Sequence, residues 1–309
     1  MSLAAQIKPY THRTATVLFL ALLAALAVPP KHGPTPFVLA GGVIVAEAVR
    51  LLRIHLRPDD NGGRVTSGDL AALIYGFFFA WHLSTAHAHL LDAVFFPPPE
   101  SILRLFFHEL PALASGAVGS LSKLISGYVL ALAAGVGLGV LFGSNRRLFA
   151  AASPFAKALG PIPPIIYTPY AICFLPGLVT AQIFVIFIGA FWPVFLSTLN
   201  GIQNIPRGQL DAARTLNLTG HALRLKVLLP GALPSICSGA LLGLVFAFIL
   251  LTAAELIGSS SGAGWYIKNY ADFGDFERVI VGVIFVAILV LVVTAVTDRI
   301  EHRLLHWHR

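Results

Sequence analysis

The chain has 309 residues, of which 57% are hydrophobic and only 11% are charged, and its mean hydropathy is +0.81. Soluble globular proteins carry charged residues at about a quarter of their positions, so this composition excludes that class and predicts a polytopic membrane protein. The net charge of +7 does not indicate nucleic-acid binding, because the basic residues stand in small groups beside apolar segments. The cysteines, Cys173 and Cys237, lie inside apolar segments and are expected to be buried, so neither a disulfide nor a metal site is predicted.

Three apolar segments before residue 92 predict three membrane helices, over about 14–28, 36–53 and 70–90. The first segment also fits a signal peptide, because a basic start, an apolar middle and Ala25-Leu26-Ala27 satisfy a cleavage pattern, but a retained helix is preferred. The linker between the second and third segments is rich in arginine and is expected to stay in the cytoplasm by the positive-inside rule. Its arginines are Arg50, Arg53, Arg57 and Arg64.

The third segment ends in three histidines, His82, His87 and His89, with a spacing that resembles a metal site. No carboxylate or cysteine cluster accompanies them in the sequence. A polar fringe at the membrane interface is therefore preferred over a metal centre, and no metal is expected.

A proline-rich start at Pro97-Pro98-Pro99 opens a stretch over 95–113 whose apolar spacing predicts an amphipathic helix at the outer membrane face. A core of membrane helices is expected to follow it. The predicted domains are accessory helices over 1–92, a linker over 93–118 and a core over 119–309.

The first predicted core helix, over about 121–142, carries glycines at multiples of four residues along one face. These are Gly127, Gly135, Gly139 and Gly143. Small residues at that spacing allow two membrane helices to approach closely. A phosphate-binding loop is the competing interpretation, but no Lys-Ser or Lys-Thr follows the glycines, which excludes a Walker A motif.

Four further core helices are predicted over about 155–175, 180–199, 236–257 and 279–297. Prolines interrupt the first of these, which predicts broken backbone that protein covers or that lines a water-filled cavity. The interrupting residues are Pro161, Pro163, Pro164 and Pro169.

Glu255 lies near the end of a predicted helix, and a carboxylate there needs a partner or a cavity. Bonding to backbone amides of the Ser-Gly turn that follows is preferred, and a place in a translocation path is the alternative. Tyr167, Tyr170 and Trp192 are further candidates for such a path, although packing against neighbouring helices is the simpler interpretation of these aromatic side chains.

One polar segment, residues 200–235, interrupts the apolar C-terminal part of the chain, and we call it the polar loop. Pro206 suits the first turn of a helix over about 209–216, and Asn217 can end that helix in the left-handed conformation. Thr219 can cap a second short helix, which Pro230 is expected to stop.

The loop resembles the cytoplasmic loop of bacterial ABC importer permeases, whose pattern is E-A-A, three residues, G, nine residues, I-x-L-P. The matching positions are Asp211, Ala212, Ala213, Asn217, Val227, Leu229 and Pro230. Asp211, Asn217 and Val227 replace Glu, Gly and Ile of the pattern. Beyond the loop, the amino-acid sequence of residues 95–309 is similar to that of permeases of the nitrate, taurine and aliphatic sulfonate group.

The resemblance implies an all-α permease core of five helices in the bacterial inner membrane, preceded here by about three extra transmembrane helices. It also implies two ATPase subunits, a second permease copy and an extracytoplasmic substrate-binding protein, with ATP and Mg²⁺ on the ATPase. The loop would dock into the ATPase subunit. Asp211, Arg214, Arg224 and Lys226 would then form a charged rim around Ala212, Ala213 and Leu216.

No nucleophile–base pattern or nucleotide-binding motif occurs in the sequence, so the chain is not expected to be an enzyme or to bind a cofactor. An ATP-independent secondary transporter or channel is the alternative, but it predicts an inverted repeat and paired intramembrane ionisable groups, and the sequence shows neither. A membrane-embedded enzyme is a third possibility, for which only the three histidines offer candidate ligands.

Eight predicted helices place both termini in the cytoplasm, and the distribution of Lys and Arg agrees. The residues expected outside are Lys31, Arg104, Lys123, Lys268 and Arg278. Those expected inside are Lys8, Arg13, Arg50, Arg53, Arg57, Arg64, Arg146, Arg147, Lys157, Arg207, Arg214, Arg224, Lys226, Arg299, Arg303 and Arg309.

Overall fold

The computed structural model describes the backbone of residues 3–28, 36–56, 61–88, 90–92 and 94–304, and within them the side chains outside 3–13, 53–56, 61–66 and 304. The described residues form helices and no strand, which confirms the predicted all-α fold. They divide into two compact units, Met1–Pro111 with Tyr270–Val281, and Ala112–Asn269 with Gly282–Arg309. Each unit is described by itself.

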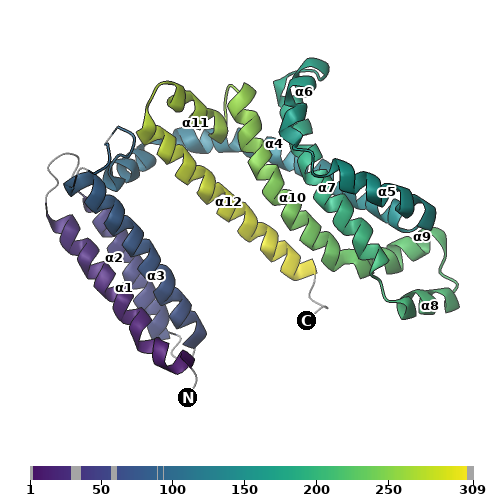
Figure 1. The fold of residues 1–309 in the computed structure, drawn as a ribbon, viewed down its shortest axis with the longest axis horizontal. Helices are drawn as coiled ribbons and strands as arrows, with labels where there is room; N and C mark the ends of the chain where they lie inside the picture. Colours follow the sequence, from purple (N-terminus) through teal and green to yellow (C-terminus); the bar gives the residue numbers. More distant parts are fainter. Residues whose placement is uncertain (1–2, 29–35, 57–60, 89, 93, 305–309) are drawn as a thin grey trace. The chain divides into compact units, whose positions relative to one another are not determined.

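The first unit contains a three-helix bundle of α1 (Leu3–Ala27), α2 (Phe37–Leu56) and α3 (Asn61–His82), which lie side by side (Figure 1). A single π-helical turn, η1 (Leu83–His87), extends α3. Apolar side chains from all three helices close the bundle core, among them Leu22, Leu39 and Tyr75. Large apolar side chains cover the opposite face of α2, as expected for a helix surrounded by lipid.

An ion pair inside this bundle corrects the expectation for Arg50. The sequence suggested a cytoplasmic linker residue, but α2 continues past it, and its side chain is buried against the Glu47 carboxylate. Arg50 Nε donates to Glu47 Oε2 at 2.7 Å, and the Tyr75 hydroxyl donates to the same oxygen at 2.9 Å. The buried Arg50 charge is therefore compensated by the Glu47 carboxylate. The hydrogen bond from Tyr75 links α3 to α2. The side chain of Arg53, and Arg57 and Arg64 beyond it, lie outside the described residues.

We expect Tyr75→Phe to lower the free energy of unfolding by about 1 kcal/mol, because it removes one buried hydrogen bond and leaves the ring packing in place. The midpoint of thermal unfolding of the detergent-solubilised chain measures this. Tyr170→Phe makes the same chemical change on a side chain that is 65% exposed and should leave the midpoint unchanged. Equal shifts in the two variants would contradict the assigned hydrogen bond.

The second unit is built on three long helices, α4 (Pro99–Gly143), α7 (Leu178–Gln203) and α10 (Leu229–Gly258), of which α4 begins in the first unit. One continuous helix, α4, covers both the expected outer-face segment and the first core helix. The shorter elements are α5 (Arg146–Leu159), η2 (Pro164–Tyr167), α6 (Thr168–Phe174), α8 (Arg207–Thr215), α9 (Gly220–Leu223), η3 (Arg224–Leu228), α11 (Ala263–Asp272) and α12 (Phe276–Leu304).

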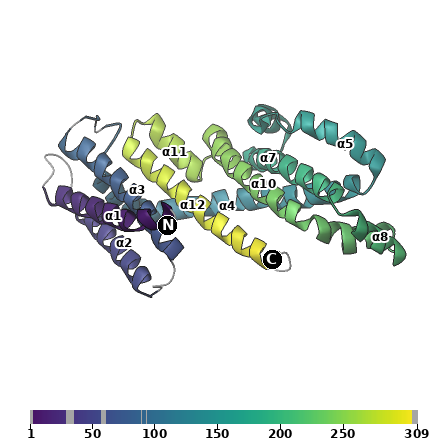
Figure 2. The ribbon, with the colours of Figure 1, turned by 60° about the horizontal axis from the view of Figure 1, so that its bottom comes forward.

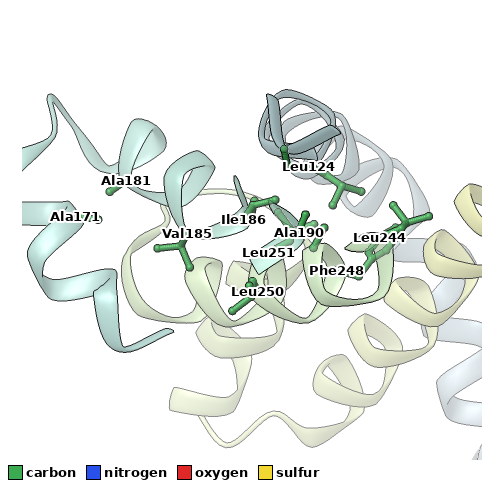
Figure 3. Close-up of a cluster of buried hydrophobic side chains, with 12 residues drawn as sticks. Leu124, Ala171, Ala181, Val185, Ile186, Ala190, Leu244, Phe248, Leu250 and Leu251 are labelled. Atoms are coloured by element: carbon green, nitrogen blue, oxygen red, sulfur yellow. The ribbon is translucent and has the colours of Figure 1, made fainter. Parts of the chain in front are cut away.

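Helices α7 and α10 run side by side over most of their length (Figures 1 and 2). The buried cluster between them and α4 forms the core of the second unit (Figure 3). It contains Leu124 from α4, Val185, Ile186 and Ala190 from α7, and Leu244, Phe248, Leu250 and Leu251 from α10. The core is therefore a continuous apolar seam that joins the three long helices.

The glycine face of α4 confirms the predicted close approach of two helices. A Cβ added at Gly139 would lie 2.6 Å from Thr198 Cβ on α7, and one added at Gly135 would lie 2.8 Å from a methyl carbon of Val194. Gly127 and Gly143 face α7 in the same way. The glycines therefore let the two helices pack at a distance that larger residues prevent.

Four helical segments among the described residues are long and apolar enough to cross a membrane: Pro99–Gly143, Leu178–Gln203, Gly220–Gly258 and Phe276–Arg303. The protein is thus a polytopic membrane protein. The proline-rich segment is broken as expected, because α5 ends at Leu159 and a 3₁₀ turn, η2, separates it from α6. The full count of eight crossings and the cytoplasmic termini stay predictions.

Candidate functional site

The polar loop projects from the end of α7 and returns into α10 (Figure 2). Helix α8 begins after Pro206, which occupies the N-cap position. Asn217 ends it with φ +54°, and the next amide, Leu218 N–H, donates to the Ala213 carbonyl at 3.0 Å. The predicted left-handed cap at Asn217 is therefore confirmed, and it sets the direction in which the chain turns back.

The return segment differs from the expected second short helix. Thr219 occupies the N-cap position of α9, but its side chain makes no capping hydrogen bond. Pro230 does not stop the helix, because α9 continues through the π-helical turn η3 into α10, and the Leu229 amide donates to the Arg224 carbonyl. Proline is tolerated here because the wider turn relaxes the demand for its missing N–H. The polar loop is thus joined without a break to a membrane-crossing helix.

A groove of about 430 Å³ opens between α8 and the start of α10. The same part of the chain contributes Ile205, Leu228 and Ala232 to a buried apolar cluster, and none of these three lines the groove. The groove lining consists of Gln209, Ala212, Ala213, Leu216, Leu218, Lys226, Val227, Pro230 and Gly231. The lining is mostly apolar and lies on a part of the chain rich in polar residues. Exposed apolar surface with a polar rim is typical of interaction sites.

The residues predicted for docking differ in their solvent exposure and in whether they line the groove. Leu216 and Ala213 both line the groove, but Leu216 is 72% exposed whereas Ala213 is buried. Asp211 and Arg214 pair with each other at 2.8 Å and are exposed. They are absent from the groove lining, because positions 209, 212, 213 and 216 share one face of α8 and positions 211 and 214 the other. Arg224 and Leu229 are half-buried at the base of the loop.

Glu255 lies at the other end of α10 and is 1% exposed. Its Oε2 accepts a hydrogen bond from the Gly264 amide at 2.9 Å, which confirms the predicted bond to the Ser-Gly turn. The Ser120 hydroxyl donates to the same carboxylate at 2.8 Å, and the Ala263 amide donates to Ser120 Oγ at 2.9 Å. The carboxylate therefore joins α4, α10 and the start of α11.

Lys123 is expected on the outer side of the membrane, and that placement stays a prediction. Its side chain is buried, and its Nζ lies 2.5 Å from Glu255 Oε1 and 3.3 Å from Ser259 Oγ. The spacing of Ser120 and Lys123 in the sequence places both side chains on one face of α4. Their common partner is Glu255, which follows Ser120 by 135 residues, so the spacing alone could not identify it.

The aromatic candidates for a path do not gather with Glu255. Trp192 packs in an aromatic group with Phe191 and Phe195, at ring-centre distances of 5.0 and 6.4 Å. Tyr170 is 65% exposed on α6, and Tyr167 is half-buried in η2. A place in a translocation path stays a prediction for these residues and for Glu255.

The histidines also differ from the expected polar fringe. His82 is fully buried, and its Nδ1 lies 3.2 Å from Oε2 of Glu100, the carboxylate that the sequence spacing did not reveal. His87 Nε2 lies 3.3 Å from the Ala25 carbonyl. His89 lies outside the described residues. Among the described residues no group of three or more His, Cys, Asp or Glu side chains is arranged to hold a metal ion.

Long apolar helices that carry a projecting polar loop with a groove define a polytopic membrane protein. The family described as "Binding-protein-dependent transport system inner membrane component" matches residues 127–306, and the chain belongs to this family.

Its relatives include the nitrate import permease protein NrtB of Leptolyngbya laminosa, 34% identical over 60% of this chain and 66% of that protein. The bicarbonate transport system permease protein CmpB of Synechococcus elongatus is 31% identical over 62% of this chain and 67% of its own. The taurine transport system permease protein TauC of Escherichia coli is 26% identical over 86% of this chain and 98% of its own.

Among solved structures, a chain of the inward-facing methionine ABC transporter MetNI superposes with a TM-score of 0.55 at 22% identity. The match covers 63% of this chain and 97% of that chain. At this identity the similarity shows the fold of the permease core.

Proposed function

We propose that this chain is the transmembrane permease subunit of an ATP-driven importer and that the groove of the polar loop receives an ATPase subunit. The supporting observation is that an exposed Leu216 and a mostly apolar groove lie directly beside the first turn of α10. A helix of a partner protein can bury apolar side chains in such a groove. The energy for transport comes from the partner, which holds ATP and Mg²⁺.

The complex we propose contains two copies of this permease, two ATPase subunits and an extracytoplasmic binding protein, in a bacterial inner membrane. Closure of the ATPase subunits pushes the two polar loops together. Because η3 continues into α10 without a break, the push acts directly on a membrane-crossing helix. A switch between inward-open and outward-open states follows from the movement of α10 and the helices packed on it.

The proposed solute is a small anion or a related zwitterion. The relatives are described as permeases for nitrate, taurine and bicarbonate, which share a small size and a negatively charged group. In an importer of this design the binding protein sets much of the selectivity. The N-terminal bundle, with its own apolar core, is an accessory packing element in this proposal.

Co-purification with a nucleotide-binding partner is the direct test. We expect the tagged permease to retain an ATPase subunit on purification, and the reconstituted complex to hydrolyse ATP faster when the binding protein is added with nitrate, taurine or bicarbonate. A preparation that retains no ATPase, and whose ATP hydrolysis does not respond to any of these solutes, would contradict the proposal. Transport in vesicles without ATP would indicate a secondary transporter instead.

A further inference from the structure

A buried polar cluster fastens the end of α10 that lies farthest from the polar loop. We call it the Lys123–Glu255 clamp, and it consists of Ser120 and Lys123 on α4, Glu255 on α10 and the backbone amides of Ala263 and Gly264. The residues Ser120, Lys123 and Glu255 are at most 4% exposed. The clamp therefore connects three segments of the second unit through one carboxylate.

We propose that Lys123 is a positioning residue for transport, whose ion pair with Glu255 makes α4 and the turn over residues 259–264 move together with α10. This proposal rests on the proposed function, because it takes the movement to begin at the polar loop. It adds a route by which that movement reaches the opposite end of the helix. Lys123 touches neither solute nor nucleotide in this role.

The continuity of α10 supports the route. The helix runs from Leu229, directly after the polar loop, to Gly258, and Glu255 stands in its last turn. The helix is continuous although Pro234 lies inside it, and it packs along α7, so in this proposal a displacement at Leu229 is carried to Glu255. The bonds of the clamp then connect the Glu255 carboxylate to α4 and to the turn.

The turn over residues 259–264 packs closely around the Glu255 carboxylate. Gly262 has φ +120°, and a Cβ there would collide with the Glu255 carboxylate, so the turn closes on that side chain. A Cβ on Gly264 would lie 2.8 Å from Glu255 Cβ. Because the turn is in such close contact, a shift of Glu255 displaces the turn.

Thiol labelling of the full complex in lipid nanodiscs tests this without knowledge of the solute. The native cysteines, Cys173 and Cys237, are replaced by serine, and Ser260→Cys places a single reporter thiol on an exposed position of the turn. The rate of maleimide labelling is measured without nucleotide and with Mg-ATP plus vanadate. We expect the two rates to differ in the reporter protein with an intact clamp. In the double variant Lys123→Met/Glu255→Gln we expect the difference between the two labelling rates to shrink about tenfold. A change of this size is typical of energetic coupling between distant sites.

The double variant is chosen because it removes both charges, so no uncompensated charge stays buried and the chain keeps its fold. Val179→Cys is the matched control reporter. It is 57% exposed at the start of α7, where Gln182 Nε2 donates to the Gly258 carbonyl at 3.1 Å independently of the clamp. Its response to nucleotide should be the same with and without the clamp charges.

Each outcome decides a different point. An unchanged nucleotide response of the Ser260→Cys reporter in the double variant, with the ATPase still bound, would overturn the role of Lys123 and leave the proposed function standing. The absence of a response in the reporter protein with an intact clamp would overturn it too, since the turn would then not follow α10. Failure of the ATPase to bind any permease variant, including the unmodified chain, would overturn the proposed function.

Discussion

Leu216→Glu is expected to detach the ATPase subunit from the permease while the permease itself stays folded. The side chain is 72% exposed and lines the groove, so a glutamate there stays in water in the free permease but would be buried in a mostly apolar groove in the complex. Central apolar anchors of this kind contribute about 2 kcal/mol or more to binding, which corresponds to about 30-fold in affinity. The amount of ATPase that co-purifies with the tagged chain, and the ATP hydrolysis of the mixture, measure the loss.

Gly208→Glu is the matched control for this variant. It changes the net charge by the same amount on the same helix, it is not part of the groove, and a side chain at this position meets no atom within 4 Å. We expect it to retain the ATPase. Equal loss in both variants would mean that the charge of the polar loop, and not the groove, governs docking. Retention of the ATPase by Leu216→Glu would show that the docking surface lies elsewhere.

Local features of the polar loop could be predicted because each depends on a few neighbouring residues. A left-handed C-cap needs a residue that tolerates positive φ, and Asn217 is the only non-glycine residue with positive φ among those described. The helix before it needs only proline at its start and an apolar face. Such signals are complete within about ten residues, so the sequence alone shows them.

The end of the loop could not be predicted in the same way. Pro230 looked like a stop signal, because proline interrupts the regular hydrogen bonds of an α-helix. The chain instead widens one turn into a π-helix at η3 and continues as α10. Leu228 in η3 and Ala232 in α10 share a buried cluster with Ile205, and the local sequence does not show such a tertiary contact.

The buried contacts of polar side chains with carboxylates show the same limit more strongly. Arg50 is expected in a linker, His82 at the membrane interface and Lys123 on the outer side of the membrane. The side chain of each is buried against a carboxylate. For Lys123 and His82 that carboxylate is distant in sequence, so the pair can be recognised only once the helices are placed. Glu255 was the exception, because an acid near the end of a predicted membrane helix already requires a partner.

The glycine face of α4 predicts the second large effect, since Gly139→Val should separate α4 from α7. The added side chain starts from a Cβ 2.6 Å from two carbon atoms of Thr198, and Thr198 is itself fully buried. Relieving this overlap requires a shift of one helix, at a cost of about 3 kcal/mol. The helix propensity gained by replacing glycine is below about 1 kcal/mol, so the overlap dominates. The midpoint of thermal unfolding in detergent measures the loss.

Gly137→Val makes the same change two residues away on the same helix, at a position where an added Cβ meets no atom within 4 Å. It should change the free energy of unfolding by no more than about 0.5 kcal/mol, as for other exposed substitutions. A large loss for both variants would assign the effect to valine in a helix and not to the α4–α7 contact. A normal midpoint for Gly139→Val would mean that the two helices are farther apart than described. The contrast between Gly139 and Gly137 thus measures how much of the core's stability depends on the close approach of α4 to α7.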